Sequence, residues 1–124
     1  MALEFEKKAL DIQLVLFGEN HPDVATSYNN IGFTYGELGD NQKKLEYEEK
    51  ALKIRVSLFG SIHPDVADSY NSVGSTYKAF GQVETANEYF RKSAAIWKGL
   101  AERGNEPRYE EKAMNCLSQI TEAK

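Results

Sequence analysis

Two histidines are the residues of this chain whose types and spacing most readily suggest chemistry. His21 and His63 lie 42 positions apart, and each immediately precedes a proline. Imidazole nitrogens and cysteine thiolates are common zinc ligands, but a site needs three or four of them close together. The chain has no third histidine, and its single cysteine, Cys116, is remote in sequence from both. We therefore expect no metal site and interpret both histidines as turn or capping residues.

The sequence also lacks the patterns that position catalytic groups. It contains no nucleophile elbow, no glycine-rich phosphate loop and no paired carboxylates beyond ordinary surface glutamates. We expect a protein that is not an enzyme, with no catalytic residues and no cofactor. Cys116 is interpreted as a small core or interface residue, with a reactive thiol as the alternative.

Composition narrows the classes of partner. The chain has 124 residues, of which 15 are basic and 19 are acidic, and its net charge is −4. This balance argues against nucleic-acid binding. No apolar run approaches the roughly 18 residues that a membrane-spanning helix needs, and the N-terminal stretch does not have the form of a signal peptide. A single cysteine permits no internal disulfide, so we expect a reducing, cytoplasmic location.

A repeated segment must position whatever functional residues the chain has. The stretch from Gly18 to Gly39 recurs from Gly60 to Gly81 with 13 of its 22 positions identical and no gap. Self-similarity at a period of this size is the signature of a helical repeat array. Apolar residues recur at helical spacing, and no segment alternates at strand spacing. We expect an all-α chain of about six antiparallel helices, over residues 2–17, 22–38, 42–58, 64–80, 83–100 and 108–123.

Glycines in the middle of two of these helices predict close packing. Gly32 and Gly74 occupy the same place in the two copies, although glycine inside a helix costs about 0.5–1 kcal/mol relative to alanine. A repeated cost predicts that a neighbouring helix passes close over each glycine. Large amphipathic residues on the same face are expected to fill the core, and these are Tyr28, Tyr35, Tyr70 and Tyr77.

These residues resemble the tetratricopeptide repeat, and the 42-residue period resembles its kinesin light chain-like type. The second copy matches the family pattern throughout, with Tyr70, Val73, Gly74, Tyr77, Gly81, Ala86, Phe90 and Ser93. The first copy departs at Lys44 and Glu48, where the family has a small residue and an aromatic one, so we expect Tyr47 to turn inward instead. The resemblance implies an α-solenoid of antiparallel helix pairs, wound as a right-handed superhelix.

The repeat frame predicts one domain with half-repeats at both ends. It divides into a half-repeat over 1–18, full repeats over 19–60 and 61–102, and a C-terminal half-repeat or cap helix over 103–124. Each repeat has a first and a second helix, called here first-type and second-type helices. The helix over residues 2–17 is a second-type helix without its first-type partner, so it is expected to expose the apolar stripe around Leu10. Exposed apolar patches usually mark an interface. Either the chain is a fragment of a longer repeat array, or another copy covers its ends. For the second alternative we expect a homo-oligomer that forms through the terminal helices, with Leu3, Leu10 and Leu14 as the self-association residues.

The resemblance also implies a concave groove, lined by the first helix of each unit, that binds a protein or peptide partner. The groove-facing candidates follow the core tyrosines in register, and they are Asn29, Phe33, Glu37, Asn71, Ser75, Lys78, Asn115 and Gln119. Asparagine amides can hold a peptide main chain, or they can satisfy groups on neighbouring helices instead. The predicted function is a protein-interaction scaffold. The alternative is a structural unit that self-assembles and has no separate ligand.

Overall fold

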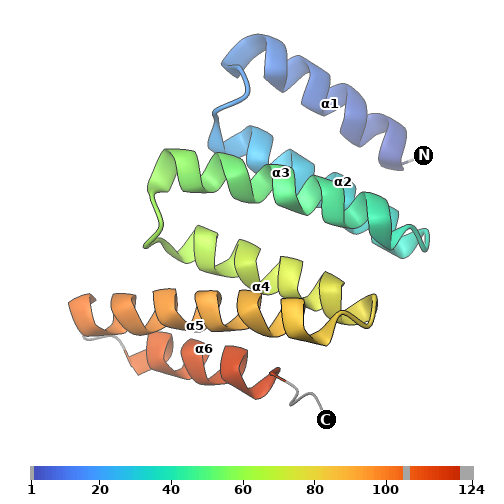
Figure 1. Ribbon diagram of the computed structural model, residues 1–124. Helices are drawn as coiled ribbons and strands as arrows, with labels where there is room; N and C mark the ends of the chain where they lie inside the picture. The colour runs from blue at the N-terminus through green and yellow to red at the C-terminus, as the bar shows by residue number, and fades with distance from the viewer. Residues whose placement is uncertain (1, 105–106, 121–124) are drawn as a thin grey trace. The chain divides into compact units, whose positions relative to one another are not determined.

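The computed structural model describes residues 2–104 and 107–120, and within them it contains six α-helices and no strand (Figure 1). The helices are α1 (Ala2–Phe17), α2 (Pro22–Glu37), α3 (Asn41–Phe59), α4 (Pro64–Ala79), α5 (Val83–Gly104) and α6 (Pro107–Ser118). The all-α prediction is confirmed. α5 continues to Gly104, beyond the expected end at Leu100. The last helix, α6, ends at Ser118, before the expected end at Ala123, which lies outside the described residues.

Local sequence explains where the repeated helices end. Gly39 and Gly81 follow α2 and α4 with φ angles of 86° and 80°, a left-handed conformation that glycine adopts without a Cβ penalty. The next residue then reaches back to the helix, because the N–H of Asp40 donates to the carbonyl of Tyr35 at 2.9 Å. The N–H of Gln82 makes the equivalent bond at 3.0 Å. Both are Schellman-type ends, which satisfy carbonyls that the helix itself leaves unpaired.

The residue contacts divide the chain into two compact units, Met1–Leu58 and Phe59–Lys124. The first unit contains α1, α2 and nearly all of α3, and the second contains α4, α5 and α6. α1 packs against α2 in the first unit, and α5 packs against both α4 and α6 in the second. By the repeat register, α2 and α4 are first-type helices, and α3 and α5 are second-type helices. The repeat boundaries and the right-handed superhelix stay predictions.

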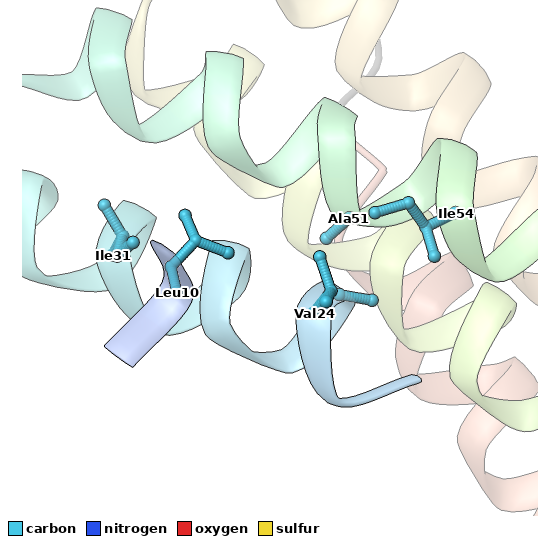
Figure 2. Packing of buried hydrophobic residues seen from close by; sticks show 6 residues of the cluster. Leu10, Val24, Ile31, Ala51 and Ile54 are labelled. Atoms are coloured by element: carbon cyan, nitrogen blue, oxygen red, sulfur yellow. The ribbon is translucent and has the colours of Figure 1, made fainter. Parts of the chain in front are cut away.

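The core of the first unit joins its three helices. Leu10 from α1 meets Val24, Ala25 and Ile31 from α2, together with Ala51 and Ile54 from α3. Figure 2 shows these side chains directed toward one another between the helices. Leu3 and Leu14 are partly buried against the same cluster. Burial of this kind contributes about 1.5–3 kcal/mol for each large aliphatic side chain.

The expected exposure of the Leu10 stripe is therefore wrong. Leu10 is only 7% exposed, because this stripe of α1 is the one that packs on α2. The opposite stripe of the helix is open instead. Among its residues, Phe5, Ile12 and Leu16 are exposed. Leu10 is buried in the core of the first unit, and Leu3 and Leu14 are partly buried against it. Self-association through these three residues stays a prediction.

The mid-helix glycines mark points of close approach, as predicted. A Cβ atom at Gly32 would lie 3.1 Å from the carbonyl oxygen of Lys44. A Cβ atom at Gly74 would lie 3.0 Å from the ring of Phe90 and 3.2 Å from the carbonyl oxygen of Ala86. Real Cβ atoms rarely come so close to other heavy atoms. Each first-type helix thus uses glycine where its second-type partner crosses it.

Tyr47 packs against both tyrosines of α2, with ring centroids 5.9 Å from Tyr28 and 5.6 Å from Tyr35. Tyr89 makes the same pair of contacts with the tyrosines of α4. An inward-facing tyrosine is therefore common to both repeats, and the departures at Lys44 and Glu48 are not its cause. Glu48 is buried where the second repeat has Phe90. The methylene groups of Lys44 lie over Gly36, with Cδ 2.7 Å from the place of a Cβ there.

Candidate functional site

Three of the predicted groove residues come together in the second unit. The side-chain amide of Gln119, just beyond α6, donates to the Oδ1 atom of Asn71 on α4 at 3.1 Å. Lys78 Nζ donates to the main-chain carbonyl of Gln119 at 3.3 Å. These bonds join α4 to the end of α6. They also use part of the hydrogen-bonding capacity of Asn71, which favours the interpretation that its amide satisfies a neighbouring helix.

A small polar hollow lies beside this contact. It encloses about 150 Å³ and is lined by Asp68, Asn71, Trp97, Lys112, Asn115, Cys116 and Gln119. Pockets for whole small ligands usually measure about 300–1,000 Å³. The hollow is therefore of the size that takes a single side chain or a few water molecules. Its lining offers an indole face, an ammonium group and several amides, so it suits a polar or aromatic group better than an aliphatic one.

Trp97 and Lys112 give this hollow its electrostatic character. The Nζ atom of Lys112 lies 4.9 Å from the centroid of the Trp97 ring system, within range of a cation–π interaction. Trp97 is buried and also packs on Tyr109, with centroids 5.3 Å apart. The indole is therefore fixed from two sides, and the lysine can still turn its charge toward solvent or a ligand.

Neither residue is among the sequence predictions. Trp97 lies on a second-type helix, whereas the groove candidates came from first-type helices, and Lys112 lies on α6 one turn before Asn115, outside the register positions that were used. The 42-residue register aligns Trp97 with Arg55 of the first repeat, so including this register position among the candidates would have found Trp97. With its amide oriented so that the oxygen faces α3, Asn29 accepts from both terminal nitrogens of Arg55, at 2.7 and 3.1 Å. In both repeats, then, the groove asparagine lies beside the same position of a second-type helix. No comparable sequence signal identifies Lys112.

The remaining predicted residues lie on α2, α4 and α6, and most of them are exposed. Phe33 is 62% exposed on α2, and Glu37 at the end of the same helix is also exposed. Ser75 is exposed on α4, one turn beyond Asn71. Asn115 is exposed on α6 and lines the hollow. An exposed phenylalanine is the type of residue that anchors a partner, but nothing in the first unit joins it to a hollow.

The first unit has its own, larger hollow. It encloses about 450 Å³ and is lined by Glu19, Asn20, Tyr28, Lys50, Lys53, Ile54 and Ser57. Lys50 Nζ lies 5.6 Å from the ring centroid of Tyr28 and 5.2 Å from that of Tyr47. Burial, with a smaller contribution from the Glu19 carboxylate, raises the pKa of the Tyr28 hydroxyl. The phenol therefore stays protonated and can donate a hydrogen bond.

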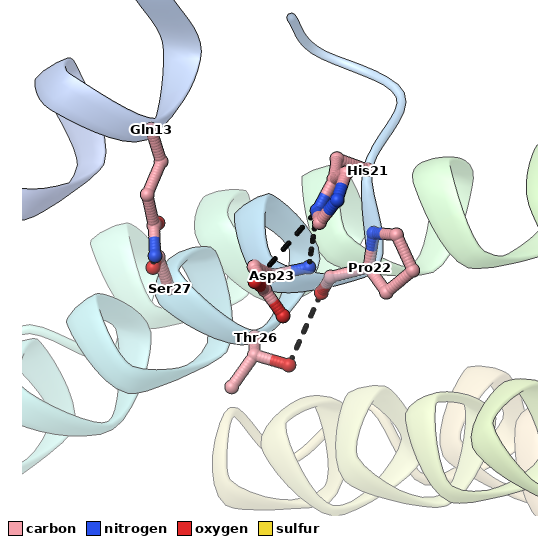
Figure 3. Close-up of polar contacts among 6 residues, drawn as sticks. All are labelled: Gln13, His21, Pro22, Asp23, Thr26 and Ser27. Carbon is pink, nitrogen blue, oxygen red and sulfur yellow. Dashed lines mark hydrogen bonds and ion pairs between the residues drawn. The ribbon is translucent and has the colours of Figure 1, made fainter. Parts of the chain in front are cut away.

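Both histidines cap helices, as the sequence predicts. The Nδ1 atom of His21 accepts from the main-chain N–H of Asp23 at 3.1 Å (Figure 3). His63 makes the equivalent bond to Asp65 at 3.0 Å. Each imidazole also stacks on a phenylalanine that ends the preceding helix, with ring centroids 4.2 Å apart. An Nδ1 atom that accepts this bond carries no proton.

Cys116 is a core residue of the second unit. Its Sγ atom lies 3.3 Å from Ser93 Oγ, and that hydroxyl donates to the carbonyl of Ala67 at 2.7 Å. The thiol is therefore the donor in the bond to Ser93. Burial raises the pKa of the thiol. A buried, protonated thiol is a poor nucleophile, so the interpretation as a core residue is confirmed.

The described part of the chain offers neither a cluster of metal ligands nor a membrane-spanning helix. No group of three or more histidine, cysteine, aspartate or glutamate side chains could hold a metal ion there. None of the six helices is both long enough and apolar enough to cross a membrane.

Paired helices and crossing glycines define a helical-repeat scaffold. A family model described as "Tetratricopeptide repeat" matches residues 24–65 and 66–104, which is more than half of the chain. The chain therefore belongs to the tetratricopeptide repeat family. Proteins of this family generally act as protein–protein interaction modules and are generally not enzymes.

Solved structures of kinesin light chain-like repeat proteins are similar to this chain. The crystal structure of BtubC (BKLC) from P. vanneervenii matches with a TM-score of 0.83 and 27% identity, over 96% of this chain and 47% of that one. The nearly identical TPR-like repeats of a candidate kinesin light chain from Podosopora anserina match with a TM-score of 0.78 and 24% identity, over 96% and 56%. This chain spans about half the length of each. A search of the curated proteins finds no match.

Proposed function

We propose that this chain is a protein-interaction module that binds a peptide or a partner helix along its first-type helices. The observation that carries this proposal is the polar hollow of the second unit, which three predicted groove residues line together with Trp97 and Lys112. A hollow of this size takes one side chain of a partner, while the surface around it contacts the partner's main chain. The chain is expected to act in a reducing, cytoplasmic compartment, where Cys116 stays a thiol.

Rigid helices make such a hollow useful. Asn71 and Trp97 belong to helices that pack along their length, and the bond from Gln119 fixes the amide of Asn71 before any partner arrives. A partner then loses less entropy in ordering the site. An amide oxygen has two acceptor positions, so Asn71 can accept a second bond while it keeps the first. Asn115, which is exposed beside it, adds a further donor and acceptor.

The first unit can contribute a second contact. Phe33 and Glu37 lie one turn apart on α2, and both are exposed. We propose that they offer an apolar anchor and a negative charge to the same partner. Lys78 near the end of α4 adds a positive charge, although its ammonium group already bonds to the end of α6. A partner that suits this set carries an aromatic or polar side chain between groups of mixed charge.

A peptide library displayed on phage and selected on the intact chain tests this proposal. Selected peptides should lose about tenfold or more in affinity for the Asn71→Ala and Lys112→Ala variants, since hot-spot residues dominate binding. Ser72→Ala is the matched control, because Ser72 is exposed on α4 next to Asn71 but does not line the hollow. Peptides that bind all four proteins equally would show that the hollow is not the site.

Self-assembly is the second candidate function, and the specific observation in its favour is the open apolar stripe of α1. Phe5 is 72% exposed and Ile12 is 59% exposed. Light scattering over a hundredfold range of concentration tests this candidate. A defined oligomer that Ile12→Glu disperses would favour assembly over peptide binding. A mass that stays at 14.0 kDa throughout would exclude it.

A further inference from the structure

We propose that the hollow of the first unit binds a small organic carboxylate, meaning a free molecule with one carboxylate group on an apolar body. The hollow encloses about 450 Å³, which lies within the range of pockets that hold whole small ligands. All of its lining residues lie between Glu19 and Ser57, inside the first unit. The inference therefore does not depend on the proposed peptide site of the second unit.

One face of α3 supplies more than half of the lining. The residues are three or four positions apart, which places them on the same side of a helix, and they are Lys50, Lys53, Ile54 and Ser57. Ile54 is buried, whereas the other three are exposed. This face therefore offers an apolar floor with two ammonium groups and a hydroxyl group around it.

α2 and the connection before it supply the rest of the lining, through Tyr28, Glu19 and Asn20. The side chain of Tyr28 is half-buried, and Lys50 Nζ lies 5.6 Å from the centroid of its ring. Because burial raises the pKa of Tyr28, its hydroxyl keeps its proton and can donate a hydrogen bond to an anion. An ammonium group and a phenol therefore lie next to each other at the hollow.

The second repeat shows which lining residues belong to the packing of the helix pair. By the 42-residue register, the tyrosine, the first lysine and the isoleucine recur as Tyr70, Lys92 and Ile96. Lys92 Nζ lies 5.6 Å from the ring centroid of Tyr70, as the equivalent lysine does in the first repeat. These three positions therefore have a packing role in both repeats.

Three other polar groups of the lining are absent from the second repeat. Ile62, Ala95 and Gly99 stand where the first repeat has Asn20, Lys53 and Ser57. The second helix pair forms without an amide, an ammonium group or a hydroxyl at these places, so the fold does not require them. Within the described residues, no hydrogen bond or ion pair engages these three side chains of the first repeat. They are therefore available to a ligand.

The charges of the lining favour a ligand with a single negative charge. Lys50 and Lys53 contribute two positive charges and Glu19 contributes one negative charge, so one carboxylate makes the occupied hollow neutral. A phosphate monoester would instead bring two negative charges close to the Glu19 carboxylate, where like charges repel. Carboxylate oxygens also accept hydrogen bonds from ammonium and phenol groups, and such charge-assisted bonds are strong.

The size and the floor of the hollow favour an apolar body on the ligand. A carboxylate held by the lysines and the phenol fills only part of about 450 Å³. The remaining space adjoins Ile54 and the ring of Tyr28, which suit an aromatic group or a short aliphatic one. A glutamate side chain of a partner protein presents the same carboxylate without such a body, so the two sources can be distinguished.

Phenylacetate is the probe, added to the isotopically labelled intact chain and followed by NMR of the main-chain amides. Its signals should shift saturably with a Kd below about 1 mM, and the shifts should concentrate on α3 and on the connection between α1 and α2. Phenylacetamide, which has the same shape but no charge, should bind at least about tenfold more weakly, since bonds to charged groups are the stronger ones.

Lys53→Ala gives the first repeat the residue that the second repeat has at Ala95. It should weaken the binding of phenylacetate about tenfold, because one of the two ammonium groups is lost. Lys53 is exposed and alanine favours helix, so circular dichroism should show an intact fold. Lys43→Ala is the matched control, since Lys43 is also exposed on α3 but does not line the hollow. It removes the same charge and should leave binding unchanged.

Four results would overturn the inference. The first is no saturable shift up to about 10 mM phenylacetate. The second is equal binding of phenylacetamide, which would mean that the carboxylate is not recognised. The third is an equal effect of Lys53→Ala and Lys43→Ala, which would place the probe elsewhere. The fourth is tighter binding of a capped peptide with a single glutamate, which would assign the hollow to a partner's side chain.

Discussion

The imidazole and thiol groups of this chain take part in hydrogen bonds within the fold. Each histidine accepts a main-chain N–H through Nδ1, and Cys116 donates its proton to Ser93. Groups held in this way stabilise the fold and are poorly suited to bind metals or attack substrates. At the scale of the residue, the chemistry that the sequence first suggests is therefore structural.

The cap formed by His63 can be tested by substitution. His63→Ala should lower the free energy of unfolding by about 1 kcal/mol, because α4 loses the acceptor for the N–H of Asp65. His63→Asn should restore most of this loss, since an asparagine side chain can accept the same bond. Urea denaturation of the three proteins measures the difference. Equal losses for alanine and asparagine would assign the effect to the stacking on Phe59 instead.

The raised pKa of the buried Cys116 thiol predicts a pH dependence of stability. As pH rises, the thiol of the unfolded chain loses its proton first, so the unfolded state is favoured and stability falls. The effect is absent below the ordinary thiol pKa and grows above it. Urea denaturation from about pH 7 to about pH 9.5 should show a steeper fall for the parent chain than for Cys116→Ala. Parallel curves would contradict the prediction.

At the scale of the element, the same helix pair occurs twice, with different side chains packed between its two helices. The second repeat buries Phe90 against Gly74, while the first has Glu48 at the equivalent position and lays Lys44 over Gly36. The aromatic contacts of Tyr47 and Tyr89 are nevertheless alike in both repeats. Backbone crossing at the glycine therefore sets the geometry of the pair, and the neighbouring side chains adapt to it.

Two glycine substitutions distinguish a crossing point from an open helix surface. Gly74→Ala should destabilise the chain by about 1–3 kcal/mol, because its Cβ atom would press on Phe90 and on a main-chain carbonyl. Gly99→Ala should be neutral or stabilising by up to about 1 kcal/mol, since α5 has open space there and alanine favours helix. Thermal unfolding compares them. A stabilising Gly74→Ala would mean that the helices can move apart at little cost.

At the scale of the whole molecule, the chain is a short run of repeats. It matches the family model twice and spans about half the length of the similar solved structures. A few side chains must therefore supply most of its binding energy. Such side chains gather at the hollows of the two units and on the open stripe of α1.

The two stripes of α1 predict opposite outcomes for similar substitutions across the whole chain. Leu10→Glu should destabilise the protein by at least about 3 kcal/mol, because it buries a carboxylate in the core of the first unit. Ile12→Glu should change the stability by less than about 0.5 kcal/mol, as expected for a surface position. Circular dichroism melting curves measure both. Similar curves for the two variants would show that the stripes are assigned the wrong way round.

Much of the fold follows from local sequence. Prolines and histidines before α2 and α4, and glycines after them, define helix ends through bonds within a few residues. Periodicity identifies the apolar faces, and the repeat of Gly32 as Gly74 identifies where helices cross. These features depend on neighbours in the chain, and for that reason the sequence alone determined the helices, their caps and the family.

Tertiary structure decided which surfaces stay available. α1 carries two apolar stripes of similar quality, and only packing against α2 shows that Leu10 is buried while Ile12 is open. The partner of Asn71 is Gln119, and the hollow beside them depends on Trp97 and Lys112 from two other helices. Such contacts join residues far apart in sequence. Periodicity reports which residues share a face of one helix, but it cannot report what covers that face.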